Sequence, residues 1–138
     1  MLIVDASCLY EVVADSARAE QVRKRLLDDT EQAAPHVLDV EVLGVIRRHH
    51  LIGRLDRTAA HQAVEDLREW PGERFGHRDL LARAWELRDQ ARPWDALYIA
   101  LAEALDGTLI TLDHRLGRVP GLDCRVEVLG DSRPIEPR

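Results

Sequence analysis

The chain alternates between short uninterrupted apolar runs and longer stretches in which apolar residues recur every three or four positions. The short runs are typical of strands buried on both faces, and the longer pattern is typical of amphipathic helices. Residues 2–5 and 108–112 are expected to form such strands. Residues 73–76 and 125–129, which include charged residues, are expected to form a short strand and a last strand at the sheet edge. Strands that alternate with helices in this way predict an α/β fold with a mainly parallel sheet.

Capping residues, prolines and glycines mark the ends of the expected helices. Ser7 and Ser16 are expected to cap the first two, and Pro93 to occupy the first helical position of the last. The expected helices cover residues 7–14, 16–29, 37–52, 58–70, 80–90 and 93–106. The whole pattern predicts one domain over residues 1–130, followed by a flexible tail at residues 131–138.

The bulk properties of the 138-residue chain narrow its class. No apolar stretch is long enough to span a membrane, and Asp5 interrupts the first apolar run, so neither a membrane anchor nor a signal peptide is expected. Cys8 and Cys124 form no metal-binding pair motif, which favours a reduced, cytoplasmic setting. The net charge of −6 argues against a protein that coats nucleic acid, whereas clustered acids are compatible with a metal-dependent nuclease.

Acidic residues directly follow the two clearest strands: Asp5 after the first and Asp113 after the strand at residues 108–112. The carboxyl ends of parallel strands meet at one edge of a sheet, where open α/β sheets bind their ligands. Acids gathered there would suit a divalent cation and metal-assisted phosphodiester chemistry. Taken alone, Asp5 fits a turn-forming residue equally well. Thr111 and Ser7 would add hydroxyl groups that hold a metal-bound water, unless Ser7 acts only as a cap.

Asp95 and Glu41 lie on expected helices. Asp95 falls in the first turn after Pro93, where the helix dipole favours negative charge and should keep the carboxylate ionised for a hard cation. Many first-turn acids have no such role, and for Asp95 alone that simpler interpretation prevails. Glu41 has apolar neighbours at helical spacing, so it should be paired, hydrogen-bonded or bound to metal. A salt bridge with Arg48 is the alternative for Glu41.

Basic and aromatic residues offer weaker indications of an RNA contact. The best local basic cluster comprises Arg47, Arg48, Arg54 and Arg57. Solvated helix ends are commonly basic as well, and Arg115 would either contact a phosphate or remain a solvated loop residue. Trp94 would suit stacking on a base, but packing is the favoured interpretation for it and for Trp70 and Trp85.

Four segments carry a family pattern: Ile-Val-Asp-Ala-Ser at residues 3–7, the segment from Pro35 to Glu41, Trp-Asp-Ala-Leu-Tyr-Ile-Ala-Leu-Ala at residues 94–102, and Leu-Ile-Thr-Leu-Asp-His-Arg-Leu at residues 109–116. In order and spacing they resemble the PIN domain, and within that family the VapC-type toxins of bacterial and archaeal toxin–antitoxin pairs. The resemblance extends to about residue 130. It implies a three-layer α/β/α sandwich with a central, mainly parallel twisted sheet.

The resemblance also implies an activity on an RNA substrate. It predicts a Mg²⁺-dependent endoribonuclease, with Mn²⁺ as an alternative metal, which forms a homodimer and is neutralised by a cognate VapB-type antitoxin that covers the active groove. The acidic quartet of the family maps onto Asp5, Glu41, Asp95 and Asp113. Within the site we expect direct metal ligands at Asp5 and Asp95, supporting hydroxyl groups at Ser7 and Thr111, and RNA contacts at Arg47, Arg48 and Arg115.

Two other functions have weaker support in the sequence. A haloacid-dehalogenase-like phosphotransferase would normally carry a second Asp two residues after the first, where this chain has Ser7. A catalytically silent, metal-dependent RNA- or protein-binding module would have no reason to keep four mutually repelling carboxylates. The sequence does not reveal the surface of the homodimer, although exposed apolar positions within residues 58–70 are candidates for the contact.

Overall fold

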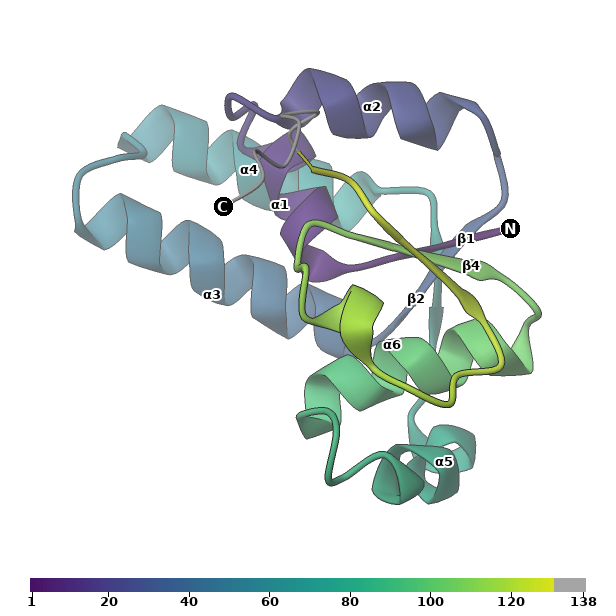
Figure 1. Cartoon of the computed structure of the whole chain (residues 1–138). Coiled ribbons are helices and arrows are strands. Elements are labelled where there is room, and N and C mark those ends of the chain that lie inside the picture. Colours follow the sequence, from purple (N-terminus) through teal and green to yellow (C-terminus); the bar gives the residue numbers. More distant parts are fainter. Residues whose placement is uncertain (131–138) are drawn as a thin grey trace, which may run out of the picture.

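Five parallel strands form the centre of the molecule, in the order β3-β2-β1-β4-β5 (Figure 1). The computed structural model describes residues 1–130. The strands are β1 (Leu2–Val4), β2 (Gln32–Pro35), β3 (Glu73–Phe75), β4 (Thr108–Thr111) and β5 (Arg125–Val128). The predicted parallel sheet is therefore confirmed, and β5 lies at its edge as expected.

Helices cover both faces of this sheet (Figure 1). Helix α1 (Ala6–Val13) packs on one face, and α6 (Pro93–Ala104) packs on the other against β1, β2 and β4. Around α1 lie α2 (Ala19–Leu27), α3 (Val37–Leu51) and α4 (Arg57–Glu69), while α5 (Leu81–Glu86) packs on α6. Two short 3₁₀ helices, Arg78–Leu80 and Leu116–Arg118, complete the described elements. The fold is a three-layer α/β/α sandwich, as the resemblance implied.

The core explains why the first strand and the last long helix have no polar face. All residues of β1 are buried, because helices cover the sheet from both sides. In α6 the seven residues from Ala96 to Ala102 are all buried, since this helix lies between the sheet and α5. One hydrophobic cluster joins residues from Leu2 to Leu129. The expected tail at residues 131–138 lies outside the described part of the chain, so the predicted domain limits stay predictions.

Several local expectations were wrong. Strand β2 was not anticipated, because Gln-Ala-Ala-Pro contains no β-branched or aromatic residue that favours a strand. Ser7 does not cap α1, because the helix begins at Ala6 with Asp5 at the N-cap position. Ser16 precedes α2 by a turn, and its carbonyl accepts a hydrogen bond from the backbone of Ala19, where the helix begins.

Two further expectations concern helices on the surface. The helix expected over residues 80–90 is shorter in the structure, where a 3₁₀ turn ends at Leu80 and α5 ends at Glu86. In α4 the apolar residues Ala60, Ala63 and Leu67 point into the core, whereas Ala59 is exposed, so the expected dimer contact at residues 58–70 stays a prediction. No helix within residues 1–130 combines the length and apolar character that a membrane span requires.

Arg74 on β3 closes the end of α4. Its guanidinium donates to the carbonyl oxygens of Leu67 at 2.6 Å and Trp70 at 2.7 Å, and to the Asp39 carboxylate at 3.0 Å. The Arg74 side chain is largely shielded from water. Removing it would therefore leave all three acceptors without their donor, and water would replace it only in part. We expect Arg74→Ala to lower the free energy of unfolding by about 2 kcal/mol, as measured by urea denaturation.

Arg68 provides the matched control for that substitution. It lies on α4 with an exposed side chain and pairs with its surface neighbours Glu65 and Glu69. Exposed pairs contribute little, so Arg68→Ala should change the free energy of unfolding by less than about 0.5 kcal/mol. Equal losses in the two variants would show that Arg74 does not hold the end of α4. Asp39 is thus a partner in a structural cluster at the end of α4.

Candidate active site

The candidate site lies where the strand order of the sheet reverses. Strands β1 and β4 are neighbours there, with Val4 opposite Ile110, and the backbone N–H of Asp5 donates to the Ile110 carbonyl at 3.1 Å. From β1 the sheet continues to β2 on one side, and from β4 to β5 on the other. Open α/β sheets bind ligands at such a switch point, outside the carboxyl ends of the strands. Asp5 and Asp113 both follow these strands, as predicted.

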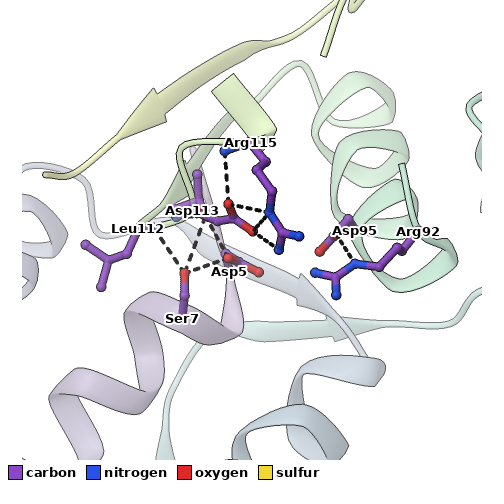
Figure 2. Close-up of polar contacts among 8 residues, drawn as sticks. Asp5, Ser7, Arg92, Asp95, Leu112, Asp113 and Arg115 are labelled. Atoms are coloured by element: carbon purple, nitrogen blue, oxygen red, sulfur yellow. Dashed lines mark hydrogen bonds and ion pairs between the residues drawn. The ribbon is translucent and has the colours of Figure 1, made fainter. Parts of the chain in front are cut away.

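Asp5 is held in place by two hydroxyl groups. The side chain of Ser7 donates to Asp5 Oδ2 at 2.6 Å, and that of Thr111 donates to the same oxygen at 2.7 Å. Ser7 in turn accepts the backbone N–H of Leu112, which ties α1 to the end of β4 (Figure 2). The structure thus brings the two expected supporting residues to Asp5 and fixes the direction of its carboxylate.

Burial makes the ionised form of Asp5 unfavourable. Only 5% of the residue is exposed. Burial therefore raises the pKa of Asp5, and the two hydroxyl donors offset this only in part, while the nearby Asp95 adds repulsion. A carboxylate in this setting gains from a cation placed beside it.

Glu41 is the least satisfied acid of the four. It projects from α3, and its Oε1 is buried without a hydrogen-bond partner among the described residues. The Tyr98 hydroxyl, also buried, is likewise without a partner. Burial raises the pKa of Glu41 to about 7, with the Tyr98 hydroxyl lowering it and repulsion by Asp5 and Asp95 adding to the rise. The alternative salt bridge to Arg48 is not formed within residues 1–130, so Glu41 is available for a ligand.

Asp95 occupies the first turn of α6, as predicted, behind Pro93. Arg92 donates to its Oδ2 at 3.2 Å (Figure 2). Burial nevertheless raises the pKa of Asp95, with a further contribution from Asp113, against the lowering effect of Arg92. Desolvation therefore opposes the favourable effect that we expect from the helix terminus, and the ionisation of this carboxylate stays a prediction.

Asp113 differs from the other three acids because its pKa is lowered rather than raised. Arg115 donates through Nη2 to Oδ2 at 2.7 Å and through Nε to Oδ1 at 3.1 Å. This two-point contact holds the pKa of Asp113 below its usual range. Figure 2 shows the guanidinium groups of Arg115 and Arg92 beside Asp113 and Asp95. Arg115 is thus paired with a site carboxylate rather than freely solvated.

All four acids line one groove with a volume of about 560 Å³. Of the arginines proposed for RNA contact, Arg48 lines this groove, whereas Arg47 is not among its lining residues. Arg18 and Arg92 also line it, and the sequence interpretation missed both. Arg92 had a weak signal, because it precedes Asp95 by three positions, a spacing that favours an ion pair. Arg18 had none, since it lies between two helices.

The three tryptophans were all expected to pack in the interior, but they differ in burial. Trp70 is buried, as predicted. Trp94 is 40% exposed and lines the groove, and Trp85 is 68% exposed, so the packing interpretation is wrong for both. The single apolar run of α6 gave no periodicity from which the solvent-facing side of its first turn could be determined.

The donor set suits a hard divalent cation, although the side chains are not gathered around one point. Within residues 1–130, no three Asp, Glu, His or Cys side chains are arranged to hold a metal ion. Instead, the Asp95 carboxylate forms an ion pair with Arg92, and the Asp113 carboxylate forms one with Arg115. The unpartnered Oε1 of Glu41 and the desolvated carboxylates would each be stabilised by a cation. The metal-binding and catalytic roles of the quartet stay predictions.

Comparison with known proteins supplies independent findings. The PIN domain family model matches residues 2–122. Ribonuclease VapC3 of Mycobacterium tuberculosis is 42% identical over 118 residues, which cover 85% of this chain and 85% of that protein. Ribonuclease VapC1 of the same species is 35% identical over 128 residues, which cover 92% of this chain and 96% of that protein.

A solved structure extends the likeness to three dimensions. A toxin–antitoxin complex from Klebsiella pneumoniae contains a chain that matches with a TM-score of 0.64 at 17% sequence identity. The match covers 93% of this chain and 97% of that one. At this identity the likeness concerns the fold.

Proposed function

Because this chain belongs to the PIN domain family, we propose that it is a metal-dependent endoribonuclease that hydrolyses RNA phosphodiester bonds in the groove. The observation that carries the proposal is the shared lining: four acids from four separate parts of the chain face one groove at the switch point of the sheet. The VapC relatives, matched over most of their length, are named ribonucleases, which supports RNA as the substrate.

Asp5 and Asp95 would hold Mg²⁺ or Mn²⁺ directly, with Glu41 and Asp113 completing the acidic set. When bound, such a metal supplies a water-derived nucleophile and charge stabilisation at a phosphate. Ser7 and Thr111 orient Asp5 for this task through their hydrogen bonds to Oδ2. Glu41 Oε1, which has no hydrogen-bond partner among residues 1–130, would accept a hydrogen bond from the attacking water. Arg92 and Arg115 would exchange their carboxylate contacts for phosphate oxygens of the RNA.

The proposal includes partners. We place the protein in the cytoplasm as the toxin of a toxin–antitoxin pair, a homodimer neutralised by a VapB-type antitoxin that covers the groove. The names of the VapC relatives and the toxin–antitoxin complex that shares the fold support the toxin role and the antitoxin partner. Beside the groove, Val40 and Leu43 on α3 are exposed apolar side chains that an antitoxin segment would cover. Light scattering would test the dimer.

Cleavage of a mixed RNA pool by the purified protein tests the function. We expect cleavage with Mg²⁺ or Mn²⁺ and none with EDTA, followed by gel analysis of the products. A folded, antitoxin-free protein that binds the metal but leaves every RNA in the pool intact would contradict the proposal. That result would favour the alternative function, a catalytically silent, metal-dependent RNA- or protein-binding module of the same fold.

A further inference from the structure

Trp94 presents a large aromatic surface inside the groove. It is the second residue of α6 and directly precedes Asp95, and 40% of it is exposed. The seven residues that follow Asp95 are fully buried, so only the first turn of this helix faces the groove. Burial of an indole is strongly favourable. The part of this indole that remains in water beside the site acids can contact a ligand with a flat apolar face.

The indole is held in position before any ligand arrives. Pro93 fixes the backbone at the first helical position. The Arg92 guanidinium lies over the Trp94 ring, 5.1 Å from its centroid, while its Nε donates to Asp95. One arginine thus connects the aromatic surface to a site carboxylate. A surface restrained in this way loses little conformational entropy when a ligand stacks on it.

Charges elsewhere in the groove indicate what kind of ligand has such a face. Arg18 and Arg48 line the same groove as Trp94, away from α6 on the connection before α2 and on α3. Arginines suit phosphate groups, and an indole suits the face of a nucleobase. Among ligands, a nucleic-acid strand combines both features within one nucleotide unit.

We propose that Trp94 is the stacking surface for one unpaired nucleobase next to the bond that is cleaved. The inference rests on the proposed ribonuclease function and specifies the substrate further. A base inside a duplex has both faces covered by its neighbours, so it cannot stack on a protein side chain unless it leaves the helix. The RNA at the site of cleavage is therefore single-stranded or looped out.

The test measures binding rather than cleavage. A short fluorescent single-stranded RNA of mixed sequence, and the same RNA annealed into a duplex, are titrated with full-length Asp5→Asn protein in Mg²⁺, and anisotropy is recorded. Adding Trp94→Ala should weaken single-strand binding roughly tenfold. Trp94→Phe should restore most of the affinity and Trp94→Leu should not, because leucine is apolar but not flat. Duplex binding should change less than about twofold.

Trp85 provides the matched control. It is 68% exposed and also carries an arginine over its ring, Arg88 at 4.8 Å, but it does not line the groove. Trp85→Ala should leave single-strand binding within about twofold of the parent. The inference is overturned if Trp94→Ala binds the single strand as well as its parent, if both RNA forms weaken equally, or if no variant binds RNA. If only the proposed ribonuclease function is wrong, single-strand binding will still depend on Trp94, but the unmodified protein will not cleave RNA.

Discussion

Replacing Asp5 with asparagine is expected to reduce RNA cleavage at least about a hundredfold without unfolding the protein. Asparagine keeps an oxygen that accepts the hydroxyl bonds of Ser7 and Thr111, so the local geometry survives. It removes a charge that burial disfavours, since burial raises the pKa of Asp5. The metal-free variant should therefore be as stable as the parent or more stable, which separates loss of function from loss of fold.

Asp89 supplies the control for this substitution. It is an exposed aspartate outside the groove, so Asp89→Asn should cleave RNA at the parent rate. Initial rates at saturating Mg²⁺ and urea unfolding in EDTA measure the two quantities. Cleavage by Asp5→Asn within about tenfold of the parent would mean that the carboxylate next to the switch point does not take part in the chemistry.

The metal-free protein is expected to lose stability as the pH rises from about 4.5 to about 7, because of Glu41. Burial raises its pKa from 4.5 in the unfolded chain to about 7 in the folded one. The folded state thus binds the proton more tightly, and this contribution is fully present below pH 4.5 and lost as the pH passes the folded value. Since the side chain is partly exposed, the loss should be on the order of 2 kcal/mol.

Glu41→Gln isolates this effect. The raised pKa values of Asp5 and Asp95 act in the same direction but begin lower, from 3.8, and the lowered pKa of Asp113 acts only below that value. Urea unfolding in EDTA across this pH range should show the fall in the parent and a flatter profile in Glu41→Gln. Glu31→Gln, an exposed control outside the groove, should retain the fall. Identical profiles for the parent and Glu41→Gln would show that Glu41 is not the titrating group.

The positions of several groove acids could be predicted from the sequence, because an apolar run indicates where a buried strand ends. Asp5 and Asp113 follow buried strands, and a parallel sheet brings the carboxyl ends of such strands together irrespective of the loop conformations. Glu41 was indicated by a different signal, a charge at helical spacing from apolar neighbours. In these cases the inference needed only the local pattern and the topology of an α/β sheet.

The arginine pairs and the exposed indole were not predictable in the same way. Whether Arg115 meets Asp113 or solvent depends on the conformation of the loop after β4, which no periodicity encodes. Helix α6 is apolar over its whole buried length, so its sequence does not show that Trp94 faces the groove. Strand β2 was missed because small residues, not β-branched ones, lie against α6 at that point.

Calorimetric titration with Mn²⁺, paired with RNA cleavage rates across the same Mn²⁺ series, tests most directly whether the groove acids and a metal act together. We predict that the cleavage rate follows Mn²⁺ occupancy in the parent protein. In Asp95→Asn both curves should move together to at least about tenfold higher Mn²⁺ concentration. Full-rate cleavage in EDTA, or Mn²⁺ binding that Asp95→Asn leaves unchanged, would contradict a metal-dependent nuclease site built on these carboxylates.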